Sequence, residues 1–180
     1  MFAVLLAVGT LPARAAGPGN VYIYGGAADT NDFSRLDTDN LAVELGVGFN
    51  YLGSGWDAHL EVNFFSSEVD VNDPMLGKFT RKQSQLGFGV RKYWGQKRMH
   101  PNLGVGLSWL TFDNVTTRDG LISDATVGLW LDGGLDWDVG KGIQLGFIGR
   151  VSATSGIGVE STKHGGGYHL GGRLSWGWKR

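Results

Sequence analysis

Serine, glutamate and histidine stand close together in one polar segment near the end of this 180-residue chain. The segment contains Ser155, Glu160, Ser161 and His164. A serine nucleophile, a histidine base and a carboxylate that orients the histidine are the residue types of acyl-transfer enzymes. Polar loops are also rich in serine and threonine for turn formation alone. We therefore expect no catalytic residue here.

Carboxylates are concentrated in two other polar segments. Oxygen ligands of this kind suit calcium or magnesium. No segment has the spacing of an EF-hand loop, and acidic surface loops are usually only solvated, so we expect no metal site. The acidic residues concerned are Asp29, Asp32, Asp37, Asp39, Glu68, Asp70 and Asp73.

The elements that must position such residues are strands. In residues 41–51 the odd positions carry leucine, valine, phenylalanine and tyrosine, and the even positions carry small or polar residues. Alternation with period two predicts strands with one apolar face. The predicted strands are residues 20–27, 41–51, 56–66, 83–94, 102–112, 124–138, 143–152 and 167–178.

The connections between these strands alternate between long and short. The short ones, at residues 53–55, 95–101 and 140–142, carry glycine or proline. Antiparallel neighbours joined in this way place all short turns at one end of the sheet and all long loops at the other. The predicted long loops are residues 28–40, 67–82, 113–123 and 153–166.

The volume of the interior decides which face points inward. An eight-stranded barrel has an interior just wide enough for side chains to fill. The large apolar set cannot fit there, which also disfavours a soluble, lipocalin-like cup. The apolar face therefore points outward, and so large an apolar surface requires lipid. An open sheet edge in hydrocarbon would leave backbone groups unpaired. The sequence thus predicts a closed antiparallel eight-stranded up-and-down transmembrane β-barrel.

The opposite face carries charges of both signs. Buried charges are costly unless they are paired, so we expect a hydrogen-bonded network that fills and rigidifies the interior. A narrow ion path through these charges is the alternative. The predicted interior residues are Glu44, Asp57, His59, Glu61, Arg91, Asp132, Asp136, Arg150, His169 and Arg173, whereas we expect His100 to be solvated in a turn.

Aromatic residues gather at the strand ends beside the short turns or the C-terminus. Rings with a polar edge prefer the lipid headgroup level, so these residues predict a girdle there. Its predicted members are Tyr51, Trp56, Trp94, Trp137, Trp176 and Trp178.

Composition excludes several classes of protein. The net charge is −1, which argues against nucleic acid, and the absence of cysteine excludes disulfides and thiolate metal sites. The chain has 31 glycines, and only 18% of its residues are charged. No apolar run approaches the roughly 20 residues that a membrane-spanning helix needs.

The N-terminus has the pattern of a secretory signal. An apolar block is followed by Pro12 and by alanines around Arg14, which is typical of a signal peptide and its cleavage site. We expect residues 1–16 to be a cleaved signal peptide and residues 17–180 to form the barrel.

The mature chain resembles the small eight-stranded outer-membrane barrels of the OmpA/OmpX kind. The resemblance rests on the loop alternation, on residues 134–142 running into 143–146, and on the closing strand from Tyr168 to Trp178. In that family the final strand ends in an aromatic residue and serves as a signal for the barrel-assembly machinery. Here Lys179 and Arg180 follow Trp178.

The resemblance implies a porin-like protein of the Gram-negative outer membrane, exported through the signal peptide. Members of this group range from anchors and adhesins to lipid-modifying enzymes. For this chain we expect a monomeric, non-enzymatic anchor or surface-interaction protein without cofactors, in contact with membrane lipids and lipopolysaccharide. A small channel is the alternative, and a lipid-modifying enzyme is less favoured because no segment resembles the lipid A deacylase or palmitoyl transferase motifs.

Overall fold

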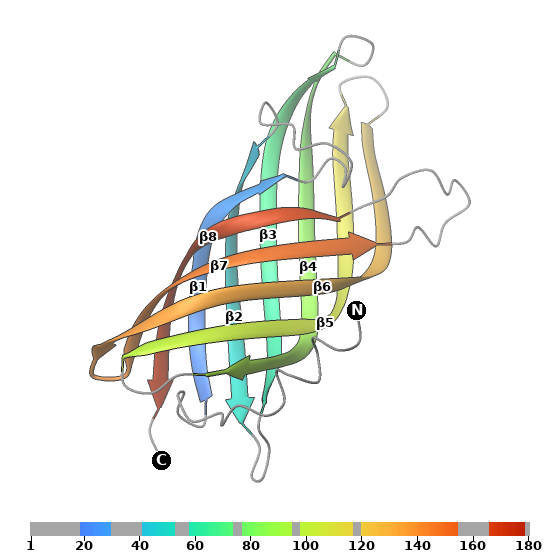
Figure 1. Ribbon diagram of the computed structural model, residues 1–180. Coiled ribbons are helices and arrows are strands. Elements are labelled where there is room, and N and C mark those ends of the chain that lie inside the picture. The colour runs from blue at the N-terminus through green and yellow to red at the C-terminus, as the bar shows by residue number, and fades with distance from the viewer. Residues whose placement is uncertain are drawn as a thin grey trace.

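The protein is a closed antiparallel barrel in which each strand pairs with its neighbours in the sequence and β1 pairs with β8 (Figure 1). The computed structural model describes residues 19–29, 41–52, 58–73, 77–94, 98–116, 120–154 and 166–178. No helix among these residues is long and apolar enough to cross a membrane. The strands are β1 (Gly19–Asp29), β2 (Leu41–Leu52), β3 (His59–Asp73), β4 (Gly77–Tyr93), β5 (Met99–Thr116), β6 (Gly120–Gly140), β7 (Ile143–Thr154) and β8 (Gly166–Trp178).

The strand register gives the tilt of the barrel. When the paired residues are followed from Gly19 around all eight strands, the path returns to β1 at Asp29, ten residues further along. Eight strands with this stagger are inclined by about 40° to the barrel axis. The resulting interior is narrow, so side chains on opposite walls meet across it.

The predicted fold class is confirmed, and the apolar face points outward. On β2, Val43 and Leu45 are 72% and 66% exposed, whereas Glu44 between them is 1% exposed. The same alternation runs along the described parts of the other strands. We call the outward-facing apolar residues the apolar belt.

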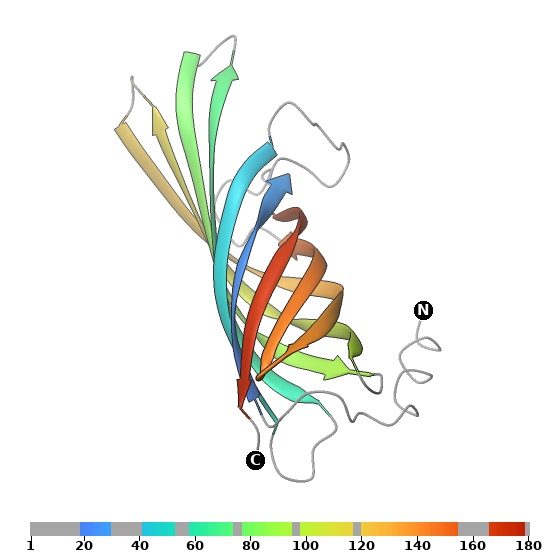
Figure 2. The ribbon, with the colours of Figure 1, turned by 90° about the vertical axis from the view of Figure 1, so that its left-hand side faces the viewer.

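Two hairpins are longer than the alternation predicted. Residues 67–82 and 113–123 were expected to be loops, but β3 continues to Asp73, β4 begins at Gly77, and β5 and β6 are separated by only residues 117–119. These hairpins rise above the ends of β1, β7 and β8 (Figure 2). The other two predicted long loops largely coincide with residues outside the described ranges.

The height of the apolar belt matches a bilayer. On β5 it runs from Met99 to Trp109, and ten residues of a strand tilted by about 40° rise about 25 Å. Outer-membrane barrels have an apolar band of about this height. Above it, Ser66 and Ser84 face outward with their hydroxyls 3.4 Å apart, and Lys82 lies 3.0 Å from Glu68.

We call the end of the barrel with the connections at residues 53–58, 94–98 and 141–142 the short-turn rim, and the opposite end the long-loop rim. The tightest turn of the short-turn rim joins β6 to β7. Gly140, Lys141 and Gly142 have φ of +104°, +55° and +78°. Glycine adopts such angles freely, whereas a residue with a Cβ adopts them at a cost in strain.

Candidate functional site: the polar lumen

The interior of the barrel, the lumen, is filled by polar and charged side chains that every strand contributes. Each of these side chains has a buried position because it occupies the parity opposite to the apolar belt. The buried acidic and basic residues described are Asp29, Glu44, His59, Glu61, Arg91, His100, Asp132, Asp136, Arg150, His169 and Arg173.

Two carboxylates and two guanidinium groups form a central cluster, made of Glu61, Arg91, Asp132 and Arg150. Arg91 donates from Nε to Glu61 Oε2 at 2.6 Å and from Nη2 to Asp132 Oδ2 at 2.7 Å. Arg150 donates from Nη2 to the same Asp132 oxygen at 2.8 Å. The charges of the four side chains cancel. Paired in this way, buried charges avoid most of the penalty of an isolated charge.

Neutral groups complete the hydrogen bonds of the central cluster. The Tyr22 hydroxyl and the Asn63 amide both donate to Glu61 Oε1, at 2.7 and 2.8 Å. Arg150 Nη1 donates to Asn63 Oδ1 at 3.1 Å. The cluster is thus tied to β1, β3, β4, β6 and β7 at once, so the lumen cannot open at this level without breaking several bonds.

Two aromatic rings contact the guanidinium group of Arg150. Its guanidinium carbon lies 4.1 Å from the ring centre of Phe65 and 4.4 Å from that of Trp130. Cation–π contacts away from water contribute about 2 kcal/mol or more. The Trp130 indole is fixed in turn, because its Nε1 donates to the Leu107 carbonyl at 3.0 Å.

Glycines on β4 and β5 make room for the Trp130 indole. A Cβ at Gly89, Gly104 or Gly106 would lie 2.5–2.9 Å from the indole, which is closer than real side chains approach. A Cβ at Gly87 would lie 3.0 Å from it. Other aromatic side chains of the lumen also pack against glycines: Tyr22 lies on Gly48, Phe65 on Gly46, and Tyr24 on Gly26 and Gly171.

A second ion pair lies nearer the short-turn rim. Arg173 pairs with Asp136, and its guanidinium stacks over Tyr22 with the ring centre 5.2 Å away. Asn102 links this pair to the central cluster, because it accepts from Arg91 Nη1 at 2.6 Å and donates to Asp136 Oδ2 at 3.1 Å. The two ion-paired groups therefore form one continuous network.

Glu44, His169 and Ser152 form a third group. His169 Nδ1 lies 2.7 Å from Glu44 Oε1, and its Nε2 lies 3.0 Å from Ser152 Oγ. This is the order of groups in an acyl-transfer triad. However, Ser152 is 0% exposed. It is also paired with Trp130 and Gly167 in the sheet, so its backbone does not offer a donor to an oxyanion.

The predicted interior residues can now be placed individually. Nine of the ten are buried in the lumen, and Asp57 lies outside the described residues. His59 is buried against the ring of Tyr93, with the two ring centres 5.0 Å apart. The expectation that His100 is solvated was wrong: it is 3% exposed, because β5 begins one residue before it and points it inward. The predicted loop group around His164 also lies outside the described residues.

The sequence reasoning missed the large side chains of the lumen. Their parity was visible, since Trp130 shares that of Asp132 and Ile148 shares that of Arg150. The volume argument, however, favoured small residues inside. The facing glycines were the signal that space for rings exists. The missed residues are Tyr22, Tyr24, Phe65, Tyr93, Leu110, Trp130 and Ile148.

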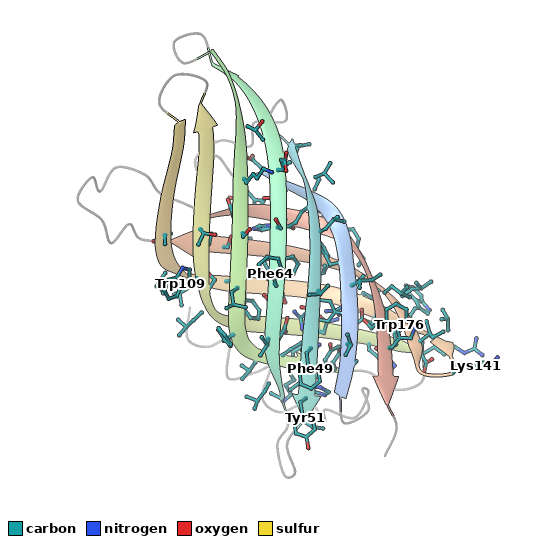
Figure 3. The ribbon with its side chains drawn as sticks, turned by 180° about the vertical axis from the view of Figure 1, so that it is seen from behind. Phe49, Tyr51, Phe64, Trp109, Lys141 and Trp176 are labelled. Atoms are coloured by element: carbon teal, nitrogen blue, oxygen red, sulfur yellow. The ribbon has the colours of Figure 1, made fainter. Side chains whose placement is uncertain are left out.

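Three of the six predicted girdle residues face outward near the short-turn rim. Tyr51, Trp137 and Trp176 are 45%, 47% and 44% exposed, while Trp94 is partly buried. Trp56 and the side chain of Trp178 lie outside what the structure describes. Figure 3 shows Tyr51 and Trp176 on the outer surface, together with Trp109, which is 58% exposed and lies toward the other rim.

No group of three or more potential metal ligands occurs among the described residues. Three of the seven acidic residues considered for a cation site, Asp32, Asp37 and Asp39, lie outside those residues. In the described ion pairs of the lumen, the carboxylates bind arginine or histidine. Their oxygens are therefore not arranged as ligands around a common centre.

Solved structures with a similar fold are outer-membrane proteins. Neisserial surface protein A (NspA) is 14% identical, with 92% of this chain and 100% of that chain covered and a TM-score of 0.71. The N-terminal β-barrel domain of Pseudomonas aeruginosa OprF is 13% identical, with 90% and 100% covered and a TM-score of 0.55. Ail, the attachment invasion locus protein of Yersinia pestis, solved with the heparin analogue sucrose octasulfate, is 9% identical, with 90% and 100% covered and a TM-score of 0.58.

No sequence family and no curated protein matches the chain. The likeness to the three solved proteins therefore concerns the fold: this chain has the fold of a small eight-stranded outer-membrane β-barrel.

Proposed function

Proceeding from this fold, we propose that the chain is a monomeric, non-enzymatic barrel of the bacterial outer membrane that serves as an anchor or surface-interaction protein. The observation that carries the proposal is the combination of an apolar belt on every strand with a lumen closed by paired charges. The belt needs lipid, and the closed lumen leaves the surface above the membrane as the part that can meet a partner.

The surface above the membrane consists of the two long hairpins and the connections around residues 28–40 and 153–166. The hairpins extend the barrel sheet above the apolar belt, because β3–β4 and β5–β6 stay paired in register up to Asp73–Gly77 and Thr116–Gly120. We propose that this rim contacts lipopolysaccharide and an extracellular partner. Residues 1–16 would direct export, and β8 would serve as the signal for the barrel-assembly machinery.

Three measurements test this proposal. The folded barrel should resist extraction into buffer without detergent, and it should migrate differently on a gel before and after boiling. Purified protein in planar bilayers should show no steady conductance. A chain that stays in buffer as a soluble monomer would contradict membrane residence, and a steady current through the wild type would contradict the closed lumen.

A narrow channel is the second candidate, and the arginine-lined lumen is the observation that favours it. Arg150 is the residue to change, because it belongs to the central cluster and contacts the rings of Phe65 and Trp130. If the network only gates a path, Arg150→Ala should raise the conductance above that of the wild type. If neither the wild type nor Arg150→Ala conducts, the channel hypothesis is wrong.

A lipid-modifying enzyme is supported only by the Glu44–His169–Ser152 group. The ring and the two oxygens are at hydrogen-bond distances, but the burial of Ser152 argues against access of an acyl chain to its hydroxyl. We propose that the group instead ties β2, β7 and β8 together across the lumen.

A further inference from the structure

Basic side chains are grouped at the short-turn rim. Lys92 lies at the end of β4, Arg98 in the connection to β5, and Lys141 in the turn between β6 and β7. Arg98 and Lys141 are exposed, and Lys92 is partly buried with its Nζ 6.0 Å from the ring centre of Trp94.

These basic residues lie at the depth of lipid headgroups. The backbone N–H of Asp138, next to the outward-facing Trp137, donates to the Arg98 carbonyl at 2.8 Å. The N–H of Gly177, next to Trp176, donates to the carbonyl of Gly142 at 2.7 Å. The basic residues therefore adjoin the aromatic residues that mark the edge of the apolar belt, as Lys141 and Trp176 do in Figure 3.

The two rims differ in charge. Residues 52–58, 92–101, 138–142 and 179–180 of the short-turn side carry six bases against two acids. Residues 28–40, 67–82, 113–123 and 153–166 of the long-loop side carry ten acids against six bases. A surface with an excess of bases attracts anions.

The backbone at Lys141 gives an independent indication. Its φ of +55° lies in the left-handed region, which glycine or asparagine occupies with less strain. The turn already has glycine on both sides, at Gly140 and Gly142. An exposed lysine with a strained backbone in this turn fits a role for its charge rather than for the turn.

We propose that the short-turn rim binds the phosphate groups of anionic phospholipids, such as phosphatidylglycerol, in the leaflet that these turns face. The proposal rests on the membrane residence inferred above. Lysine and arginine next to a bilayer surface extend their charge into the headgroup layer while their aliphatic parts stay beside apolar surface. The aromatic residues fix the depth, and the bases select the lipid.

The test uses the full-length mature protein folded in phosphatidylcholine bilayers that contain a trace of spin-labelled lipid. The fraction of label immobilised by the protein is compared for phosphatidylglycerol and phosphatidylcholine. One basic side chain near an anionic headgroup favours it by about fivefold, so the wild type should prefer phosphatidylglycerol by about that factor. The preference should weaken as salt is raised, because salt screens exposed charges.

The triple variant Lys92→Gln, Arg98→Gln, Lys141→Gln should lose the preference, whereas Lys82→Gln at the long-loop rim should keep it. A wild type without preference, or a triple variant that retains it, would overturn the proposal. If the wild type bound isolated peptidoglycan and showed no lipid preference, the proposal would also be overturned.

The gel shift on boiling separates this proposal from the proposed function. Variants that show the shift are folded barrels, so a missing lipid preference then concerns the rim alone. A wild type that neither shifts nor enters bilayers would contradict membrane residence and the lipid site together.

Discussion

The indole of Trp130 and the guanidinium of Arg150 stack in the middle of the lumen, 4.4 Å apart. The two residues lie on adjacent strands, with Trp130 paired to Ser152 and Arg150 to Asp132. The indole lies flat on glycines, and the guanidinium reaches both Asp132 and Asn63. This pair joins the polar network to the aromatic packing, so changes at either residue should affect both.

Replacing Arg150 by methionine should destabilise the barrel by about 3–5 kcal/mol, because Asp132 then loses one of its two cationic partners in a buried place. Arg150→Lys should cost less, since it keeps the charge but loses the planar fork. The free energy of unfolding in urea, measured in lipid bilayers, checks this. A loss for Arg150→Met of no more than about 1 kcal/mol, as for an exposed pair, would contradict the central cluster.

Replacing a glycine by alanine should destabilise the barrel more on the inner face, where glycines pack against Trp130, than on the outer face. A Cβ at Gly106 would lie 2.2 Å from the Phe88 carbonyl oxygen and 2.7 Å from both Gly89 Cα and the Trp130 indole, so Gly106→Ala should cost about 1–3 kcal/mol. The matched control is Gly133→Ala, whose nearest atom would be 3.7 Å away on the outer face. Thermal unfolding of the two variants should differ, and equal midpoints would contradict the inward position of Trp130.

Arginine in the apolar belt should be costly in a way that depends on depth. Val105 lies between Trp109 and Met99 on β5, so Val105→Arg should cost about 2–4 kcal/mol in bilayers. Val139, which is exposed next to the short turn, should tolerate arginine at a cost of about 0–1 kcal/mol. Equal costs at the two positions would show that the belt does not cross a bilayer.

Ser152 should not react with a fluorophosphonate probe in the folded protein, because its hydroxyl is fully buried. Mass spectrometry of the treated protein gives the modified fraction. The boiled, unfolded protein is the control, because it shows whether the Ser152 hydroxyl reacts without the His169 and Glu44 contacts of the folded state. Labelling of folded wild type that disappears in His169→Gln would contradict the structural role of this group and favour an enzyme.

The alternation of apolar and polar residues predicted the strands. The prediction of some strand ends was wrong because the alternation stops where a strand leaves the bilayer. Within the bilayer the two faces of a strand meet lipid and a polar lumen, so the side chains must differ. Above the bilayer both faces of β3 meet polar surroundings, and Ser66, Ser67 and Glu68 follow Phe65 without alternation. The strand continues there because its hydrogen bonds to β4 continue.

Which charges would meet in the lumen could not be predicted from the sequence. Glu44 and His169 are 125 residues apart, on strands with β1 between them. Their contact depends on the register in which β8 pairs with β1 to close the barrel with its ten-residue stagger. The sequence of a single strand shows only which residues share a face. Arg150 could be placed inside by parity, but its contacts with Phe65 on β3 and Trp130 on β6 needed the registers of the strands from β3 to β7.

The most direct test concerns the outward orientation of the belt. The chain has no cysteine, so a single nitroxide can be attached at Leu107→Cys, which lies 58% exposed in the belt, and at Lys82→Cys, which is exposed above the belt, as the aqueous control. In bilayers, collisions with oxygen should dominate over collisions with a water-soluble nickel complex at position 107, and the reverse should hold at position 82. Preferential collision with nickel at position 107 would place that face in water and contradict the account.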